Sequence, residues 1–162
     1  METTAPFDLL VKMTITAWDS QNAILEKLTG ELTDEQWMKE ISPGKNRAIY
    51  LLGHLIAVND AMLPLLGFGQ RLFPALEEVF IKSPDKSSNV FPSVAELKQN
   101  LKTVNTKLKE AFNGTSSSQW MEKHNSVSAE DFVKEPHRNK LNVVISRTNH
   151  MSYHIGQMVL VK

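Results

Sequence analysis

The chain has 162 residues, of which 41% are apolar and 22% are charged, and its 18 Lys and Arg residues balance 18 Asp and Glu residues. Length and composition predict a single globular domain over residues 1–162, and the zero net charge disfavours a nucleic-acid partner. Cysteine is absent, which excludes disulfides, thiolate metal ligands and a cysteine nucleophile. Neither a membrane-length apolar run nor a secretory leader is recognisable, so we expect a cytoplasmic protein without a membrane partner.

The first predicted element is an amphipathic helix over residues 6–29, which Gly30 would end. Its apolar residues recur at spacings of three, four and seven, the pattern of a helix with one face in the core. These apolar positions are Leu10, Met13, Ala17, Ile24, Leu25 and Leu28. A capped short helix is predicted at 33–37, and a second long helix is predicted from about Arg47 to Leu66, kinked or ended near Leu63 by Pro64.

Residues 67–92 form the least regular stretch and are predicted to be a long connection, with a helical turn around 74–80. A third helix is predicted over 93–112, opened by a capping box in which a glutamate follows the serine N-cap by three residues. After a polar stretch at 124–138, the last helix begins near Lys140. Four long helices without β-type alternation predict an all-α fold, a four-helix bundle.

Three of the five histidines have a pattern that fits a metal site. His150 and His154 stand four residues apart, so they lie about 40° apart on one face of the last helix. His54, on the second long helix, has apolar neighbours on its own face and is also expected to point inward. A histidine on one helix that faces a pair on another is a common way to build a metal site in a bundle. The alternative is that they are ordinary core histidines. His124 and His137 lie in polar segments and are interpreted as surface residues.

The surrounding residues narrow the kind of site. Met151 follows His150, so the general-base glutamate of an HExxH metalloprotease is missing. Imidazole ligands suit zinc, nickel, copper or iron and do not select among them. Gln157 shares the face of the histidine pair and is a candidate to orient His154 or contact substrate; the alternative is a polar residue at a helix end. Arg147, one turn before His150, is a candidate to bind an anionic substrate group; the alternative is a surface ion pair.

Two sequence segments resemble the DinB/YfiT-like family. They are "LLGHLIAVND", with its GHL context around His54, and "NHMSYHIGQ", in which His154 is followed by the family's Gly-Gln ending. The resemblance covers the whole chain. It implies a bundle with an up-down-down-up course, in which the 67–92 segment is the crossover between the second and third helices. It also implies that His54, His150 and His154 are the metal ligands and that the protein forms a homodimer.

The same resemblance suggests a chemistry. Relatives include thiol-dependent transferases and a thiol-dependent isomerase that use bacillithiol or mycothiol. The chain is therefore expected to be a metal-dependent S-transferase, or a related hydrolase or isomerase, with zinc or nickel bound. A low-molecular-weight thiol would be the co-substrate and a small molecule the substrate. No residue is assigned a catalytic role, and the alternative is a metal- or ligand-binding bundle without catalysis.

Overall fold

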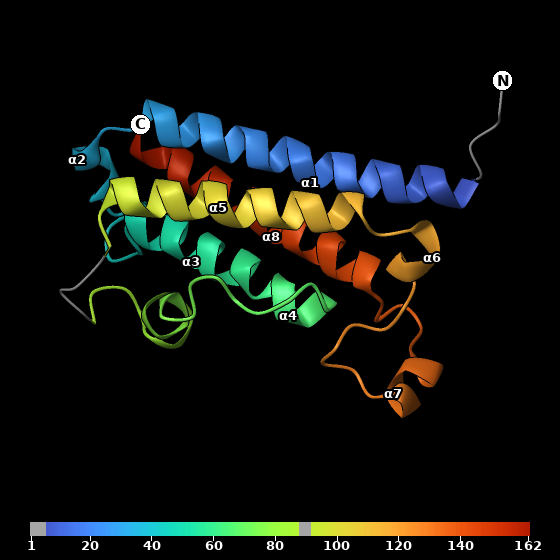
Figure 1. The fold of residues 1–162 in the computed structure, drawn as a ribbon. Helices are drawn as coiled ribbons and strands as arrows, with labels where there is room; N and C mark the ends of the chain where they lie inside the picture. Colours follow the sequence, from blue (N-terminus) through green and yellow to red (C-terminus); the bar gives the residue numbers. More distant parts are fainter. Residues whose placement is uncertain (1–5, 88–91) are drawn as a thin grey trace, which may run out of the picture.

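The computed structural model describes residues 6–87 and 92–162, and every regular element within these ranges is helical (Figure 1). The predicted all-α fold is therefore confirmed. The elements in chain order are α1 (Pro6–Glu31), α2 (Asp34–Trp37), α3 (Ala48–Asp60), α4 (Met62–Leu66), the π-helical η1 (Glu78–Lys82), α5 (Val94–Asn113), α6 (Ser117–Trp120), α7 (Ala129–Lys134), α8 (Lys140–Met158) and the 3-10 turn η2 (Val159–Val161).

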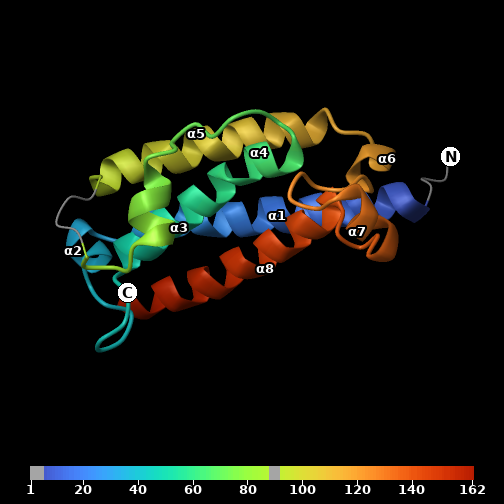
Figure 2. The same ribbon diagram turned by 90° about the horizontal axis from the view of Figure 1, so that it is seen from below.

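The long helices α1, α3, α5 and α8 pack side by side around one apolar core (Figures 1 and 2). In Figure 1, α1 and α8 run from right to left, whereas α3 and α5 run from left to right. After α4 the chain turns back and passes through η1 towards the end of the bundle at which α5 begins. Because α1 packs on α8 and α5, and α3 packs on α5 and α8, the α3–α8 seam lies opposite the α1–α5 seam.

Most helix ends follow the capping residues in the sequence. Thr33 and Ser93 open α2 and α5 with complete capping boxes, and the Asn139 side chain caps α8 by accepting the Asn142 backbone N–H. The predicted stop at Gly30 is wrong, because α1 runs on to Glu31. The buried side chains before and after this glycine hold the helix in the core, and their burial outweighs the cost of about 1 kcal/mol that a glycine brings to a helix.

The α3 helix is the most deeply buried of the long helices. Together with α4 it forms a segment, Ala48–Leu66, that is long and apolar enough to cross a membrane, but 78% of the apolar window is buried inside the bundle. The helix is interrupted at Ala61, rather than near Leu63. Pro64 explains this position, because it has no N–H for the carbonyl of Asp60 and its ring crowds that carbonyl.

Two local features differ from the prediction. The predicted helical turn around 74–80 is present, but it begins at residue 76 and continues as a π-helix over Glu78–Lys82. The polar stretch 124–138 contains a helix, α7, that was not predicted. None of the α7 residues is buried, so no apolar periodicity marks it in the sequence.

Candidate metal centre

The structure brings together the three histidines singled out by the sequence analysis. His54 projects from α3 towards His150 and His154 of α8, and all three side chains are half-buried. The Nε2 atom of His150 lies 3.2 Å from Nε2 of His54 and 3.0 Å from Nε2 of His154. The three nitrogen atoms available as ligands lie within 4.8 Å of one another. They form one compact triad, referred to below as the histidine triad.

Hydrogen bonds on the far side of the rings fix the tautomers of two members. Nδ1 of His54 lies 2.7 Å from the carbonyl oxygen of Phe80, and Nδ1 of His154 lies 2.7 Å from Oε1 of Gln157. Both oxygens only accept, so each Nδ1–H donates and each Nε2 keeps its lone pair. Two lone pairs therefore face His150, which has one Nε2 proton at most and can satisfy only one of them. A cation among the three nitrogens would satisfy all of them.

The spacing of the triad fits a metal ion. Zinc–nitrogen bonds of about 2.0–2.1 Å place the nitrogen atoms of two imidazole ligands of one ion about 2.8–3.4 Å apart for angles between right-angled and tetrahedral. The observed separations of 3.0 and 3.2 Å lie in this range. Within residues 6–87 and 92–162, His54, His150 and His154 are the only group of His, Asp or Glu side chains assembled this way. Three protein ligands leave positions open for a water molecule or a substrate.

The surroundings of His150 and His154 favour the neutral form of both side chains. Burial lowers the pKa of His150 to about 4, and the charge of Arg147 acts in the same direction. Burial also lowers the pKa of His154, against an opposing effect of its hydrogen bond with Gln157. Only neutral imidazole binds a metal ion, so these two ligands need not lose a proton at neutral pH.

The crossover is attached to α3 at points on either side of the triad. At one end, the buried carboxylate of Asp60 accepts the backbone N–H groups of Leu72 and Phe73 at 2.8 and 2.9 Å. At the other end, the Tyr50 hydroxyl donates to the carbonyl of Ser83 at 2.7 Å. The π-helix η1 lies between these attachments, and its carbonyl at position 80 contacts His54.

At the start of α3, Asp85 holds the crossover through Arg47. The Asp85 carboxylate accepts the Arg47 backbone N–H at 2.7 Å and pairs with its guanidinium at 2.7 Å. Burial raises the pKa of this carboxyl, but the hydrogen bonds from Arg47 outweigh burial and the net pKa is lowered. Neither feature was predictable from a local sequence pattern, because Asp85 is 38 residues from Arg47 and Phe80 acts through its backbone.

The remaining sequence candidates are divided between the site and the surface. Gln157 and Arg147 both lie beside the triad, the first bonded to His154 and the second lowering the pKa of His150. His124 lies between α6 and α7 beside the hydroxyl of Ser126, and His137 is exposed. Neither of these two histidines joins the triad.

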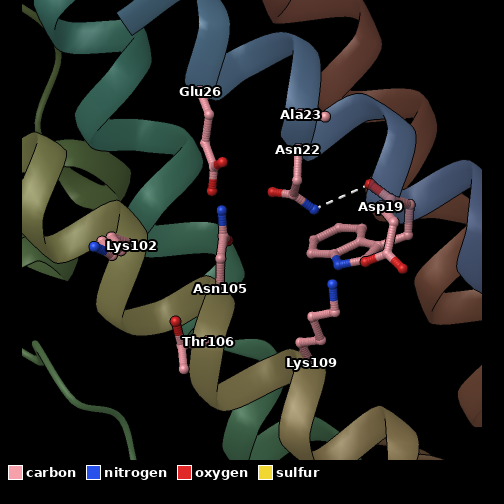
Figure 3. Close-up of a pocket in the computed structure, with 9 residues that line it drawn as sticks. Asp19, Asn22, Ala23, Glu26, Lys102, Asn105, Thr106 and Lys109 are labelled. Carbon is pink, nitrogen blue, oxygen red and sulfur yellow. Dashed lines mark hydrogen bonds between the residues drawn. The ribbon is translucent and has the colours of Figure 1, made fainter. Parts of the chain in front are cut away.

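A separate cavity of about 310 Å³ lies between α1 and α5, on the seam opposite the triad (Figure 3). Trp18 lines it, and the Nδ2 group of Asn22 donates to the Trp18 carbonyl at 3.0 Å. The Oδ1 atom of Asn22 and both amide atoms of Asn105 are buried without a hydrogen-bond partner among the described residues. No histidine lines this cavity, and the candidate metal-binding group found among the described residues lies at the α3–α8 seam.

Fold and site together define a class of protein: an all-α bundle with three convergent histidines between two of its long helices. The family model described as the DinB superfamily matches residues 17–158, which is most of the chain. The chain belongs to the DinB superfamily.

One solved structure illustrates the shared fold. The crystal structure of the conserved protein of locus from Enterococcus faecalis matches with a TM-score of 0.64, covering 93% of this chain and 93% of that chain. The sequence identity is 15%, so this likeness concerns the fold alone. No curated protein matches the chain.

Proposed function

We propose that this protein is a metal-dependent enzyme of the DinB type, a thiol-dependent S-transferase or a related hydrolase or isomerase. The observation that carries the proposal is the convergence of three Nε2 atoms, two of them with lone pairs fixed by hydrogen bonds to Phe80 and Gln157. His54, His150 and His154 would hold the ion, and zinc or nickel is the ion we expect.

A divalent ion at this position supplies Lewis acidity and favours the deprotonated form of a bound thiol or water. The residues of the chain orient the site. The Phe80 carbonyl fixes the ring of His54, and Gln157 fixes the ring of His154. The half-buried setting limits water around the triad, which strengthens electrostatic interactions with a ligand. Because the protein has no cysteine, the sulfur nucleophile would come from a small thiol such as bacillithiol or mycothiol.

Metal loading combined with a thiol-transfer assay tests this function. Protein stripped with a chelator would be reloaded with zinc or nickel, and bound metal would be measured by elemental analysis. Formation of the fluorescent adduct between bacillithiol and monochlorobimane would report transfer. We expect one ion per chain and metal-dependent adduct formation in the unmodified protein, and loss of both in His150→Ala. His137→Ala is the matched control, because it removes an exposed histidine outside the triad.

The outcomes of these assays distinguish an enzyme from a metal- or ligand-binding bundle without catalysis. Failure to retain any transition metal, or unchanged retention in His150→Ala, would overturn the metal site itself. Tight metal binding without accelerated transfer for any thiol tested would favour the non-catalytic metal- or ligand-binding bundle.

A further inference from the structure

Arg147 is the exception among the arginines of this chain. Arg47, Arg71 and Arg138 each form an ion pair with a carboxylate. Arg147 is half-buried, and it has no hydrogen bond or ion pair with any residue in 6–87 or 92–162. Its Nε atom is fully buried without a partner, and burial lowers the pKa of the guanidinium.

The position of Arg147 connects this cation to the histidine triad. It precedes His150 by three residues on α8, which is about 4.5 Å along the helix axis and about 60° around it. Burial is the main cause of the lowered pKa of His150, and the charge of Arg147 adds a smaller effect in the same direction.

The described residues provide no carboxylate to the histidine triad and no ion pair to Arg147. The triad consists of three histidines, and no carboxylate joins it within the described residues. A bound divalent ion and the Arg147 guanidinium would therefore be two positive centres without a protein counter-charge. A half-buried cation is costly without a partner, and guanidinium binds carboxylate through two parallel hydrogen bonds.

We propose that Arg147 binds a carboxylate of the co-substrate, so that the site selects a small thiol carrying a carboxylate about one helical turn from its sulfur. This inference rests on the proposed function, because it places the sulfur at the histidine triad. Arg147 acts here as a specificity-determining residue, and the histidines need no change in protonation for it.

Thiolate binding to cobalt-loaded protein tests the proposal, using the cobalt–thiolate absorption band as readout. The probes are 3-mercaptopropionate, which carries a carboxylate, and 2-mercaptoethanol, which has a hydroxyl instead. We expect the carboxylate thiol to bind about tenfold more tightly or better, the contribution typical of hydrogen bonds to charged groups. Arg147→Gln would abolish this preference, because it would weaken binding of 3-mercaptopropionate about tenfold more than binding of 2-mercaptoethanol, and Arg147→Lys would keep part of the preference.

Two controls distinguish a role of Arg147 in binding the carboxylate from a role of Arg147 in stabilising the fold. Arg138→Gln removes an arginine that is already paired with Glu135, and both thiols should bind to it as to the unmodified protein. Arg147→Gln should also keep its cobalt content and an unchanged or higher melting temperature, because it removes a cation without a partner. A structural role for Arg147 would instead lower the melting temperature.

The possible failures are distinguishable. Equal affinities of the two thiols in the unmodified protein, or an equal loss of both in Arg147→Gln, would overturn the role of Arg147 while leaving the metal site intact. Absence of cobalt binding or of any thiolate band would overturn the proposed function and, with it, this inference.

Discussion

At the residue scale, Gly53 determines how closely the crossover can approach His54. A Cβ atom at this position would lie 2.3 Å from Cε1 of the Phe80 ring, closer than real Cβ contacts allow. The Phe80 side chain is fully buried and has no space to retreat without moving its backbone. Since that backbone carries the carbonyl bonded to His54, the glycine and the ligand beside it depend on each other.

We therefore expect Gly53→Ala to destabilise the protein by about 1–3 kcal/mol, the usual cost of overpacking a core, and to weaken zinc binding. Urea denaturation and calorimetric zinc titration would measure the two effects. Gly156→Ala is the matched control, because a Cβ atom there meets nothing within 4 Å. It should stabilise α8 slightly, by about 0.5–1 kcal/mol. Equal stability and equal zinc affinity of the two variants would contradict the requirement for glycine at position 53.

The pKa of His150 gives a second prediction at this scale. Burial lowers it to about 4 in the folded protein, whereas an unfolded histidine titrates near 6.5. Between these values the unfolded chain binds more protons, so the stability of the metal-free protein must fall as pH decreases from about 6.5 towards 4. Urea titrations across this range, with chelator present, should show that loss. A His150→Gln variant should show a shallower dependence, and an equally steep one would contradict the assignment.

At the scale of elements, the crossover and α3 form one unit through the ion pair of Arg47 and Asp85. Both side chains are largely buried, with 18% and 2% of their surfaces exposed. Asp85→Asn would remove the buried carboxylate from this ion pair, so we expect the free energy of unfolding to fall by about 3 kcal/mol. Zinc affinity should also fall, because η1 would be less firmly held. Denaturant titration would measure the loss.

Glu130→Gln is the control for that prediction. It breaks the exposed Glu130–Lys134 pair of α7, and such surface pairs contribute about 0–1 kcal/mol. If Asp85→Asn and Glu130→Gln lowered the free energy of unfolding by similar amounts, burial of the Arg47–Asp85 pair would not increase its contribution to stability.

In the cavity between α1 and α5, a substitution is expected to raise rather than lower the free energy of unfolding. Both amide atoms of Asn105 are buried there without a partner among the described residues. Asn105→Leu removes these atoms at similar volume, so we expect stabilisation of about 1–2 kcal/mol, measured as a shift in the urea midpoint. Gln99→Leu, at an exposed position of the same helix, should change stability by less than about 0.5 kcal/mol. A destabilised Asn105→Leu would indicate that the amide is satisfied by a bound molecule in the cavity.

At the scale of the whole molecule, the sequence predicted the features that depend on apolar periodicity and on local capping residues. The long helices and the capping boxes at Thr33 and Ser93 belong to this class. It also singled out the three histidines, because their spacing and apolar neighbours are visible in the chain. It could not predict the Phe80 carbonyl or the Arg47–Asp85 pair, because these depend on how the crossover folds back on α3. Backbone groups and long-range ion pairs leave no local pattern.

The prediction for α1 was partly wrong, and the error is informative. Leu25 and Leu28 are buried as expected, but Leu10, Met13 and Ile24 are 49%, 61% and 47% exposed. The apolar residues of α1 therefore form two stripes. The core contacts one of them, and the other is exposed next to Ile145 of α8, across a shallow groove that also includes Leu10 and Met13.

We propose that this exposed face pairs with the same face of a second chain, forming a homodimer. The exposed stripe from Leu10 to Ile24 extends for about 21 Å along the helix, enough to form part of a two-fold interface. Met13→Glu would place a charge in the middle of that interface, so we expect dissociation to monomers, measured by light scattering after gel filtration. Metal binding should persist, because Met13 lies on α1, away from the α3–α8 seam. Lys107→Glu, an exposed change on α5, should leave the dimer intact. A monomeric unmodified protein at micromolar concentration, or a Met13→Glu variant that remains dimeric, would contradict this interface.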